Sequence, residues 1–571
     1  MRTWLWKGAA IIGVAGIGLW AAAPLLERTR PELDDDVPPT SCLQDAQVQF
    51  SAAPSAIVLG QTSKLSWAVS LPAGCTVVKV SLQSEAVWRS GSRNVAPAGT
   101  ATYHLTVRNR AGVAGSLTRS VKVTVTYPPV VVIDGRTASP ATVLVNALGS
   151  FNDKQTVELC DVDLDLTGYA PIYIQDHRTV TASPGCERGP RKLGPRIFVR
   201  RANSNAPLFE LIGDDIVFSG FRLEGPVSLI AQGDNTKVGI RITPYKEKTA
   251  PIEKIEISNM EIYYWSGAGL SVRDNPTAGN VRGRLFNTRP NAVHITGNYL
   301  HHNRHIALGY GVSVGEGAFA LIERNVFDEN RHAIGGGSKH EDFMDYSGYI
   351  ARENLFLTGG GKHCNDNFFW ALTGWTNLRC TQTHQIDMHG DGNVFPTSNN
   401  WLCGTAGETT IIERNTVLYT SGAAIKIRGN PADKAVVDGN VFKHSKRSDA
   451  IKQNGACGWG GNITNPIDVR PNNQFGVDPM AQLGSCDFAG DGVQDQFMAT
   501  GVTWWAKSPI TNQWRYLNTM TERLPALVLR RIDADLVCDV GKRTEHAETA
   551  TLNQYSQGGT TPWKSLQVLE Q

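Results

Sequence analysis

The stretch "VHITGNYL" (293–300) decides the fold, because copies of it recur along the chain. Each copy reads apolar-x-apolar-x-x-Asn-x-apolar, and the period is in the twenties where copies follow without an insertion: Asn298 and Asn325 are 27 residues apart, and Asn415 and Asn440 are 25 apart. The later copies are "ALIERNVF" (320–327), "YIARENLF" (349–356), "TIIERNTV" (410–417) and "AVVDGNVF" (435–442). Two earlier copies, "IVFSGFRL" (216–223) and "IEISNMEI" (255–262), place Phe221 and Met260 in the Asn column.

A repeat of this length with no helical pattern cannot bury its apolar face alone, so the copies must stack on one another. The stack predicts a parallel β-helix in which the Asn side chains form an inward hydrogen-bonded ladder at a bend. The repeat resembles the right-handed parallel β-helix proteins of the pectate-lyase-like superfamily. That resemblance implies the fold but not the chemistry, because the superfamily hosts many activities.

The composition agrees with an all-β chain that has many turns. The 571 residues include 57 Gly and only 7 Met, and Val, Ile, Thr and Asn recur in short runs. The formal charge is +2, which gives no reason to expect nucleic acid or a strongly acidic protein as partner.

The N-terminus predicts export. Arg2 and Lys7 precede an uncharged apolar run at 8–26, which has the length of a membrane anchor and also fits an export signal. We expect an anchor, since Pro24 follows the small residues where cleavage would fall. Either way the rest of the chain lies outside the cytoplasm.

The ten Cys fit an oxidising compartment. Neighbouring candidates for disulfides are Cys160 with Cys186 and Cys364 with Cys380. Cys486 and Cys538 would pair only if the fold brings them together.

Changes in composition divide the chain into six segments. Residues 45–127 alternate as short strands and resemble bacterial Ig-like β-sandwich domains, which usually act as spacers or adhesive modules. The segments are a membrane anchor or signal (1–30), a linker (31–44), the Ig-like sandwich (45–127), the β-helix (128–480), a segment similar to FG-GAP or VCBS repeats (481–545) and a tail (546–571).

The resemblance of 481–545 rests on two Asp-rich loops, "DFAGDGVQD" (487–495) and "RIDADLVCD" (531–539). Hard oxygen ligands at alternate loop positions suit calcium, so the first loop predicts a calcium site at Asp487, Asp491 and Asp495. That loop has Ala at one ligand position, and the second loop has Arg531 where its first ligand belongs, so the pattern is incomplete.

Each Asn-strand is followed by a second strand, and these second strands predict the functional face. They read "AGLSVRD" (268–274), "HIALGYG" (305–311), "HAIGGGS" (332–338), "HQIDMHG" (384–390), "AAIKIRG" (423–429) and "DAIKQNG" (449–455). Positions three and five are mostly apolar and point inward, so positions four and six point outward. The fourth positions are Ser271, Leu308, Gly335, Asp387, Lys426 and Lys452, and the sixth are Arg273, Tyr310, Gly337, His389, Arg428 and Asn454.

In this alignment Asp387 and His389 have Lys426 and Arg428 on the next rung, about 4.8 Å away. The glycines at 335–337 remove three side chains and leave a floor beside His389. A glycine floor walled by Tyr, His, Arg and Lys predicts a cleft for an anionic chain. The alternative is a polar exterior in which Asp387 simply pairs with Lys426.

The first positions hold His305, His332 and His384. They lie where the chain bends, and we expect a structural stack rather than a set of metal ligands.

Further substrate contacts are expected on both sides of the cleft. Arg273 and Lys452 extend the cationic columns. Trp370, Trp375 and Trp401 lie in two long loops that border the cleft, and aromatic rings of this kind stack on sugars. The alternative for each Trp is a place in the local core.

If the ligand is a uronic-acid polysaccharide, these residues suit removal of the proton next to the carboxylate. His389 beside Arg428 is biased towards the neutral imidazole and can accept the proton. Tyr310 would be the opposing acid or base, Arg428 and Lys426 would hold the carboxylate, and Asp387 would fix the Lys or the His. The set fits a polysaccharide lyase or a C5-epimerase, and "IDMHG" (386–390) is similar to the Asp-Pro-His segment of β-helix mannuronan epimerases, with Met in place of Pro.

Two other classes remain open. A glycoside hydrolase needs two carboxylates about 5–9.5 Å apart, and Asp387 with Asp342, Asp345 or Asp391 would have to supply them. A non-catalytic surface protein would use the cationic columns as a glycan-binding stripe.

Overall fold

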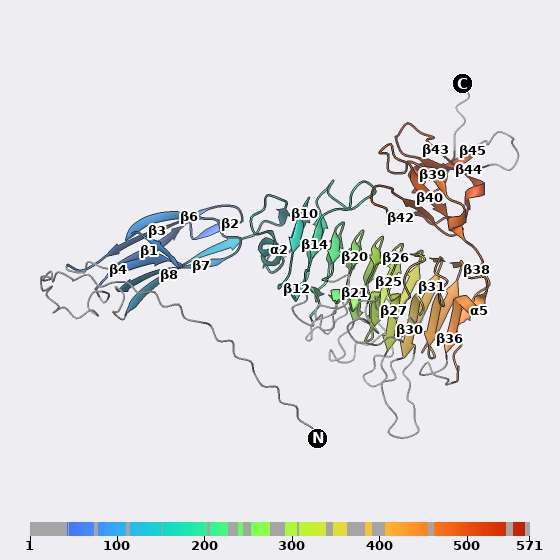
Figure 1. Ribbon diagram of the computed structural model, residues 1–571, viewed down its shortest axis with the longest axis horizontal. Coiled ribbons are helices and arrows are strands. Elements are labelled where there is room, and N and C mark those ends of the chain that lie inside the picture. Colours follow the sequence, from blue (N-terminus) through green and yellow to red (C-terminus); the bar gives the residue numbers. More distant parts are fainter. Residues whose placement is uncertain are drawn as a thin grey trace, which may run out of the picture. The chain divides into compact units, whose positions relative to one another are not determined.

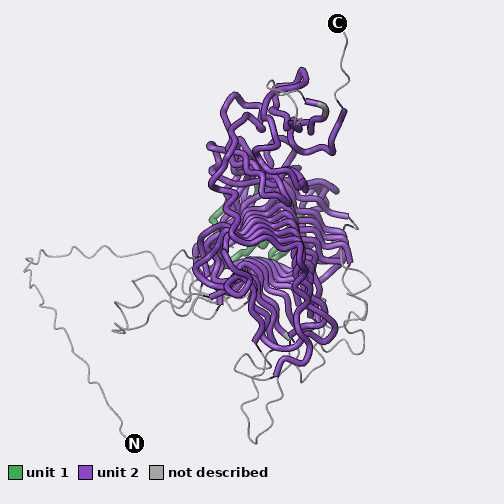
Figure 2. Tube along the Cα trace, turned by 90° about the vertical axis from the view of Figure 1, so that its right-hand side faces the viewer, with its two compact units in different colours: residues 1–51, 66–92, 103–121 green, residues 52–65, 93–102, 122–571 purple. Residues whose placement is uncertain are grey.

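A computed structural model of the chain describes most of the β-helix and both flanking regions (Figure 1). The described residues are 43, 45–73, 78–109, 115–150, 152, 154–201, 206–226, 238–243, 253–273, 292–304, 308–338, 347–361, 383–390, 406–454, 462–543 and 552–565, with only the backbone described at a few strand ends. They form an all-β fold whose centre is a parallel β-helix, which confirms the predicted fold class. The chain divides into two compact units, residues 1–51, 66–92 and 103–121, and residues 52–65, 93–102 and 122–571 (Figure 2).

The β-helix consists of three parallel sheets, and successive turns of the chain add a strand to each sheet (Figures 1 and 2). The first sheet is β9 (Val130–Ile133), β10 (Gln155–Leu159), β13 (Arg178–Ala182), β16 (Ile216–Ser219), β19 (Ile255–Ser258), β22 (Val293–Thr296), β25 (Phe319–Glu323), β28 (Gly348–Arg352), β31 (Thr409–Glu413), β34 (Lys434–Asp438) and β37 (Asp468–Val469). The second sheet is β11 (Asp163–Asp165), β14 (Arg196–Phe198), β17 (Arg222–Glu224), β20 (Glu261–Tyr263), β23 (Tyr299–His301), β26 (Val326–Asp328), β29 (Leu355–Phe356), β32 (Thr416–Val417), β35 (Val441–Phe442) and β38 (Gln474–Phe475). The third sheet is β12 (Ile172–Ile174), β15 (Phe209–Leu211), β18 (Val238–Ile242), β21 (Ala268–Arg273), β24 (Tyr310–Gly315), β27 (His332–Ser338), β30 (Ile386–Gly390), β33 (Ile425–Arg428) and β36 (Ile451–Asn454).

The Asn repeat covers two strands rather than one. In 293–300, the first residues form β22 of the first sheet and the last residues begin β23 of the second sheet. The residue before the Asn turns the chain, because it has a left-handed backbone: Gly297 has φ 65° and Arg324 has φ 58°. The sharp bend therefore belongs to the repeat itself.

The predicted Asn ladder is confirmed. The Nδ2 atom and the backbone amide of Asn298 both donate to Oδ1 of Asn325, each at 2.9 Å. The same pattern continues through Asn354, Asn415, Asn440 and Asn473. A second, shorter ladder joins Asn303 to Asn330, whose Oδ1 accepts from Asn303 Nδ2 at 2.9 Å.

Helix α2 (Pro140–Leu148) packs its apolar face into the β-helix core through Val143, Leu144, Ala147 and Leu148. The interior is otherwise filled by Val, Ile, Leu and Phe from all three sheets, including Phe221 and Met260 of the early copies. The short helix α5 (Arg447–Ala450) precedes β36.

The N-terminal region forms two small sheets. They are β1 (Gln47–Ala53), β3 (Ser63–Ser70) and β6 (Ser90–Val95), and β2 (Ala56–Val58), β8 (Ser116–Thr126), β7 (Ala101–Asn109), β4 (Val78–Leu82) and β5 (Glu85–Val87). Strand β4 pairs antiparallel with β5 and β7, and β2 pairs parallel with β8. The Ig-like assignment stays a prediction.

The C-terminal region forms two antiparallel sheets. They are β39 (Gly484–Cys486), β40 (Asp495–Ala499), β41 (Trp504–Lys507) and β42 (Trp514–Asn518), and β43 (Leu527–Arg530), β44 (Asp539–Arg543), β45 (Leu552–Ser556) and β46 (Lys564–Ser565), with short 3-10 helices η2 (Pro479–Ala481), η3 (Leu524–Ala526) and η4 (Gln557–Gly559). Because β45 and β46 pair with this second sheet, the segment continues to Ser565, where the sequence predicts a tail from 546.

The C-terminal segment packs on the outer face of the second sheet. Met498, Trp505 and Trp514 are buried in one cluster with Val326, Leu355 and Leu418 of the β-helix. Each of these six side chains is at most 4% exposed, so this is a dry apolar contact.

Two predicted disulfides are present, Cys160–Cys186 and Cys486–Cys538. Disulfides persist in oxidising compartments, so they indicate an extracytoplasmic location. Cys364 and Cys380, like the predicted anchor at 8–26, lie outside the described residues. Among the helices that are described, none has the length and apolar character needed to cross a membrane.

Candidate functional site

The outward face of the third sheet carries the predicted site. Asp387 is paired in register with Lys426, and His389 with Arg428, as the alignment of the repeats predicts. Lys426 is in turn paired with Lys452 on the next rung. Ile386 and Met388, which alternate with Asp387 and His389 along β30, are fully buried in the β-helix core, so Asp387 and His389 point away from it.

The predicted position of Tyr310 was wrong. Tyr310 begins β24 and is paired with His332, so it belongs to the first column and not to the sixth. The sixth column holds Gly315 there, between Arg273 and Gly337. The cause is an insertion: β27 begins two residues after Asn330, whereas β24 begins seven residues after its counterpart Asn303.

Because of this insertion, two consecutive rungs, β24 and β27, have Gly in the sixth column. Arg273, Gly315, Gly337 and His389 follow one another on four rungs. A cleft of about 240 Å³ opens over these glycines, and its walls include Arg273, His389 and Tyr310. The predicted cleft therefore exists, with a floor of Gly315 and Gly337 rather than of 335–337 alone.

The neighbouring glycines of β27 have other functions. The ring of Tyr310 lies over Gly335, where an added Cβ would be 2.6 Å from it. Gly336 faces inward, where an added Cβ would be 2.4 Å from Met388. At both positions an added methyl group would force a neighbouring side chain to move, Tyr310 outside the β-helix and Met388 inside it.

Asp387 is the centre of the site but is completely buried, at 0% exposure. Arg428 donates to its two oxygens from Nε at 3.1 Å and from Nη2 at 2.5 Å. The Nε2 atoms of His384 and His389 lie 3.3 Å and 3.8 Å from Asp387 Oδ2. The ion pair therefore forms with Arg428 rather than with Lys426 directly opposite, and Asp387 cannot touch a ligand.

The charges of this cluster depend on one another. Burial acts to raise the pKa of the Asp387 carboxyl, but His384, His389 and Arg428 act against it and hold the pKa well below its usual range. Asp387 is therefore an anion at neutral pH. Burial, and then the charge of Arg428, lower the pKa of Lys426, an effect that Asp387 partly offsets.

A stack of rings lies beside the carboxylate. The ring of His332 stacks on His384 at 4.4 Å and on Tyr310 at 5.5 Å. His332 Nδ1 bonds to the backbone oxygen of His384 at 2.7 Å. Burial is the main cause that lowers the pKa of both imidazoles, so both are neutral at pH 7. The predicted structural stack is confirmed for His332 and His384, whereas His305 lies outside the described residues.

By donor type, His332, His384 and Asp387 would also suit a metal ion, since their ligand atoms lie within 4.8 Å of one another. Their surroundings do not fit a cation, because the Arg428 guanidinium already binds both carboxylate oxygens. We therefore assign no metal to this cluster.

At the predicted calcium loop, the carboxylates lie next to guanidinium groups. Arg531 is 3.3 Å from Asp487, and Arg515 is 3.9 Å from Asp495. Asp487 also accepts the backbone amides of Asp491 and Gly492 at 3.1 Å and 2.8 Å. These partners compete with a cation for the carboxylates. Calcium at this loop stays a prediction.

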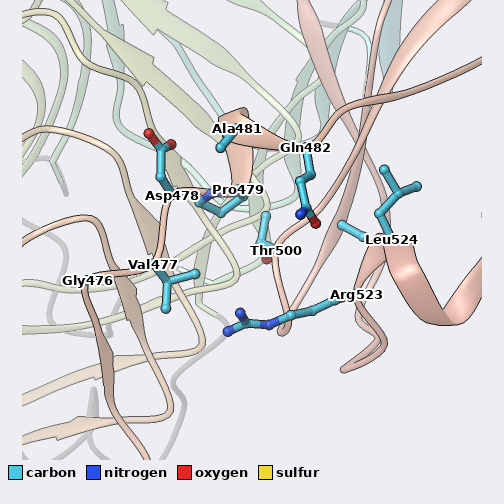
Figure 3. A pocket seen from close by; sticks show the side chains of 10 residues that line it. Gly476, Val477, Asp478, Pro479, Ala481, Gln482, Thr500, Arg523 and Leu524 are labelled. Carbon is cyan, nitrogen blue, oxygen red and sulfur yellow. The ribbon is translucent and has the colours of Figure 1, made fainter.

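A second cavity, of about 250 Å³, lies between the last turn of the β-helix and the C-terminal segment (Figure 3). Asp478, Gln482 and Arg523 are among its walls. Lys443 pairs with Asp478 at 2.7 Å, and Arg523 donates to Gln474, so these charged groups already have partners within the protein.

Sequence reasoning missed three contacts of the main site. His384 approaches Asp387 from the preceding bend, and Glu316 pairs with Arg273 at 2.8 Å. Arg331 Nη1 donates to the Tyr310 hydroxyl at 3.2 Å. The spacing of His384, three residues before Asp387, was the one available signal. The substrate-binding predictions for Trp370, Trp375 and Trp401 lie outside the described residues.

Comparisons of this chain with protein-family models, with curated proteins and with solved structures found no match. Its function must therefore be argued from the site.

Proposed function

We propose that the protein is an extracytoplasmic lyase that cleaves a uronic-acid polysaccharide by β-elimination on the outer face of the third sheet. The observation that carries the proposal is one cleft that brings together a His, a Tyr and a glycine floor, beside a row of cations. Elimination next to a carboxylate needs a base, an acid and positive charge near the carboxylate.

His389 is the proposed base. It is a wall of the cleft, and its side chain is 20% exposed, so its ring can meet a ligand. It would take the proton from the carbon next to the uronate carboxylate. Asp387 lies behind it and is a positioning residue, because it is buried and acts only through its neighbours.

Tyr310 is the proposed acid. Its oxygen accepts a hydrogen bond from Arg331, which leaves its own O–H to donate into the cleft. As the C–H electrons form the new carbon–carbon double bond, the bond to the glycosidic oxygen breaks and that oxygen takes the Tyr310 proton. Both groups then exchange protons with water and return to their starting states.

Lys426 and Lys452 are the proposed partners of the substrate carboxylate. They are adjacent in the fourth column, and Lys452 is exposed. The sequence predicts the same role for Arg428, but two of its nitrogens bind Asp387, so we propose that Arg428 chiefly holds Asp387.

C5-epimerisation shares the first step and differs only in returning the proton to the other face of the sugar. A hydrolase has less support. Asp387 is buried away from any sugar, and Asp342, Asp345 and Asp391 lie outside the described residues.

The test is a scan of the purified full-length chain against alginate, pectate and glycosaminoglycans, which follows the ultraviolet absorbance of the unsaturated product. We expect a signal that His389→Ala abolishes. His294→Ala is the matched control, since His294 pairs with Glu323 on the first sheet. Glycan binding without any product from the wild-type chain would contradict a lyase and favour an epimerase or a binding protein.

A further inference from the structure

We propose that the cleft accepts an uncharged sugar on its β21–β24 side and a uronate on its β33–β36 side. The substrate would then be a polysaccharide in which uronates alternate with neutral residues, rather than a homopolymer of uronates. This inference rests on the proposed function and adds the substrate class.

In the described residues before the glycine floor, the charges of the fourth and sixth columns balance. In the fourth column Glu210 is paired in register with Arg241, and their side chains lie 3.7 Å apart. In the sixth column Arg273 pairs with Glu316 at 2.8 Å. Two carboxylates therefore balance two guanidinium groups, and Glu316 itself is a wall of the cleft.

The floor is uncharged as well. Ser313 and Gly335 occupy the fourth column over β24 and β27, and Gly315 and Gly337 occupy the sixth. Arg273 and His389 are three rungs apart, about 14 Å, and the column positions between them carry no charged side chain. The Tyr310 ring at its wall offers a flat apolar face of the kind that packs against a sugar ring.

Among the residues that the structure describes, the fourth and sixth columns after the floor carry an excess of positive charge. Lys426, Arg428 and Lys452 share these columns with one carboxylate, that of Asp387, which is buried. A uronate over β33 and β36 would supply the missing negative charge. A second uronate over the floor would instead approach Glu316.

This arrangement also orients the substrate. The proton to be removed belongs to the uronate on the cationic side, next to His389. The neutral residue then lies over Gly315 and Gly337, so each cut falls between a neutral sugar and a uronate.

The experiment compares kcat/KM for an unsulfated polymer in which uronates alternate with N-acetylhexosamines with kcat/KM for pectate and alginate of similar chain length. We expect the alternating polymer to be favoured by about tenfold or more, which is the effect of one like-charge contact near a surface. Glu316→Gln should reduce the preference for the alternating polymer, because loss of this carboxylate should raise kcat/KM for pectate and alginate. Lys452→Glu should weaken both classes, and Lys64→Glu, an exposed site on β3, should change neither.

Equal or better rates on the homopolymers would overturn the inference and leave the lyase intact. The absence of product from every polymer would instead overturn the proposed function. If no polymer gives product, a binding measurement still tests the inference: equal affinity for the alternating polymer and for the homopolymers would contradict the predicted preference.

Discussion

Two buried polar clusters of the β-helix contrast with each other, the Asn ladder inside the core and the Asp387 cluster on the third sheet. The ladder is built of neutral amides, and each member repeats the contacts of the one before it. The Asp387 cluster holds one anion among Arg428 and two imidazoles, and no other described rung repeats this set, although Glu323 is also buried beside Arg352 and His294.

This difference suggests a structural role for the Asn ladder and a functional role for the Asp387 cluster. A satisfied ladder of amides rigidifies the stack at little electrostatic cost. A buried carboxylate pays a desolvation penalty that its ion pair often only offsets, so the pair as a whole is a poor source of stability compared with apolar side chains, although removal of one partner alone is costly. The Asp387 cluster therefore suggests a positioning role, and the two regions should respond differently to substitution.

Asn354→Ala should have the largest effect, and on stability. It removes the acceptor of the Asn325 amides and the donor to Ile322 and Asn415. With several buried groups left unpaired, we expect a loss of roughly 4 kcal/mol in the free energy of unfolding. Chemical denaturation measures it, with the exposed Asn472→Ala as control. A stable variant would contradict the structural role of the ladder.

Asp387→Asn should act mainly on activity. We expect kcat for elimination to fall on the order of 10²-fold, since His389 loses the carboxylate that positions it. The acid limb of the pH–rate profile should move to lower pH, because protonated His389 loses a stabilising negative neighbour. An unchanged profile would mean that Asp387 only supports the fold.

The effect of Asp387→Asn on thermal stability should depend on pH. The pKa of Asp387 in the folded state lies below its unfolded value of about 3.9, so ionised Asp387 favours the folded state above that pH. This contribution is lost as the pH falls from about 4 through the folded pKa. The difference in Tm between wild type and Asp387→Asn should therefore shrink in acid, whereas the effect of Asn354→Ala should not.

A pair of glycines sharpens the comparison within one sheet. Gly336→Ala pushes a methyl group against Met388 and Tyr349 in the core, and we expect a loss of about 1–3 kcal/mol in stability. At Gly315 the nearest atom to an added Cβ is the Gly337 oxygen at 3.4 Å, so Gly315→Ala should fold normally and raise KM. Thermal unfolding and steady-state kinetics distinguish the two. The reverse pattern would place the cleft elsewhere.

Asp495 should show the smallest effect, with the opposite sign to Asp387. Burial raises its pKa to about 6, an effect that Arg515 opposes. Its stability contribution is present below about pH 4 and is lost as the pH rises through about 6. The Tm should fall slightly across this range, and less so in Asp495→Asn. Added calcium would raise the wild-type Tm at pH 7 if the loop binds the ion, and no response would argue against the calcium site.

The sequence predicted most of the fold and part of the site, for physical reasons. The Asn column fixes the repeat, because a buried amide needs its neighbour at a fixed spacing. The register of Asp387 with Lys426 followed from the alternation of buried side chains along short strands. The position of Tyr310 could not be predicted in this way. The sequence pattern at 305–311 resembles a strand of the repeat, but the insertion after Asn303 means that β24 begins only at Tyr310. The burial of Asp387 could not be predicted from the sequence either, because it depends on side chains from other rungs.

The contact between the C-terminal segment and the second sheet has a consequence for the opposite side of the β-helix. Val326, Leu355 and Leu418, which contact Met498, Trp505 and Trp514, belong to the turns that continue into β27, β30 and β33. The turns that pack against the C-terminal segment are thus the same turns that carry Gly337, His389 and Lys426 on the third sheet. A protease that removed the chain after residue 480 would leave every proposed contact residue in place and still loosen the rungs that hold them.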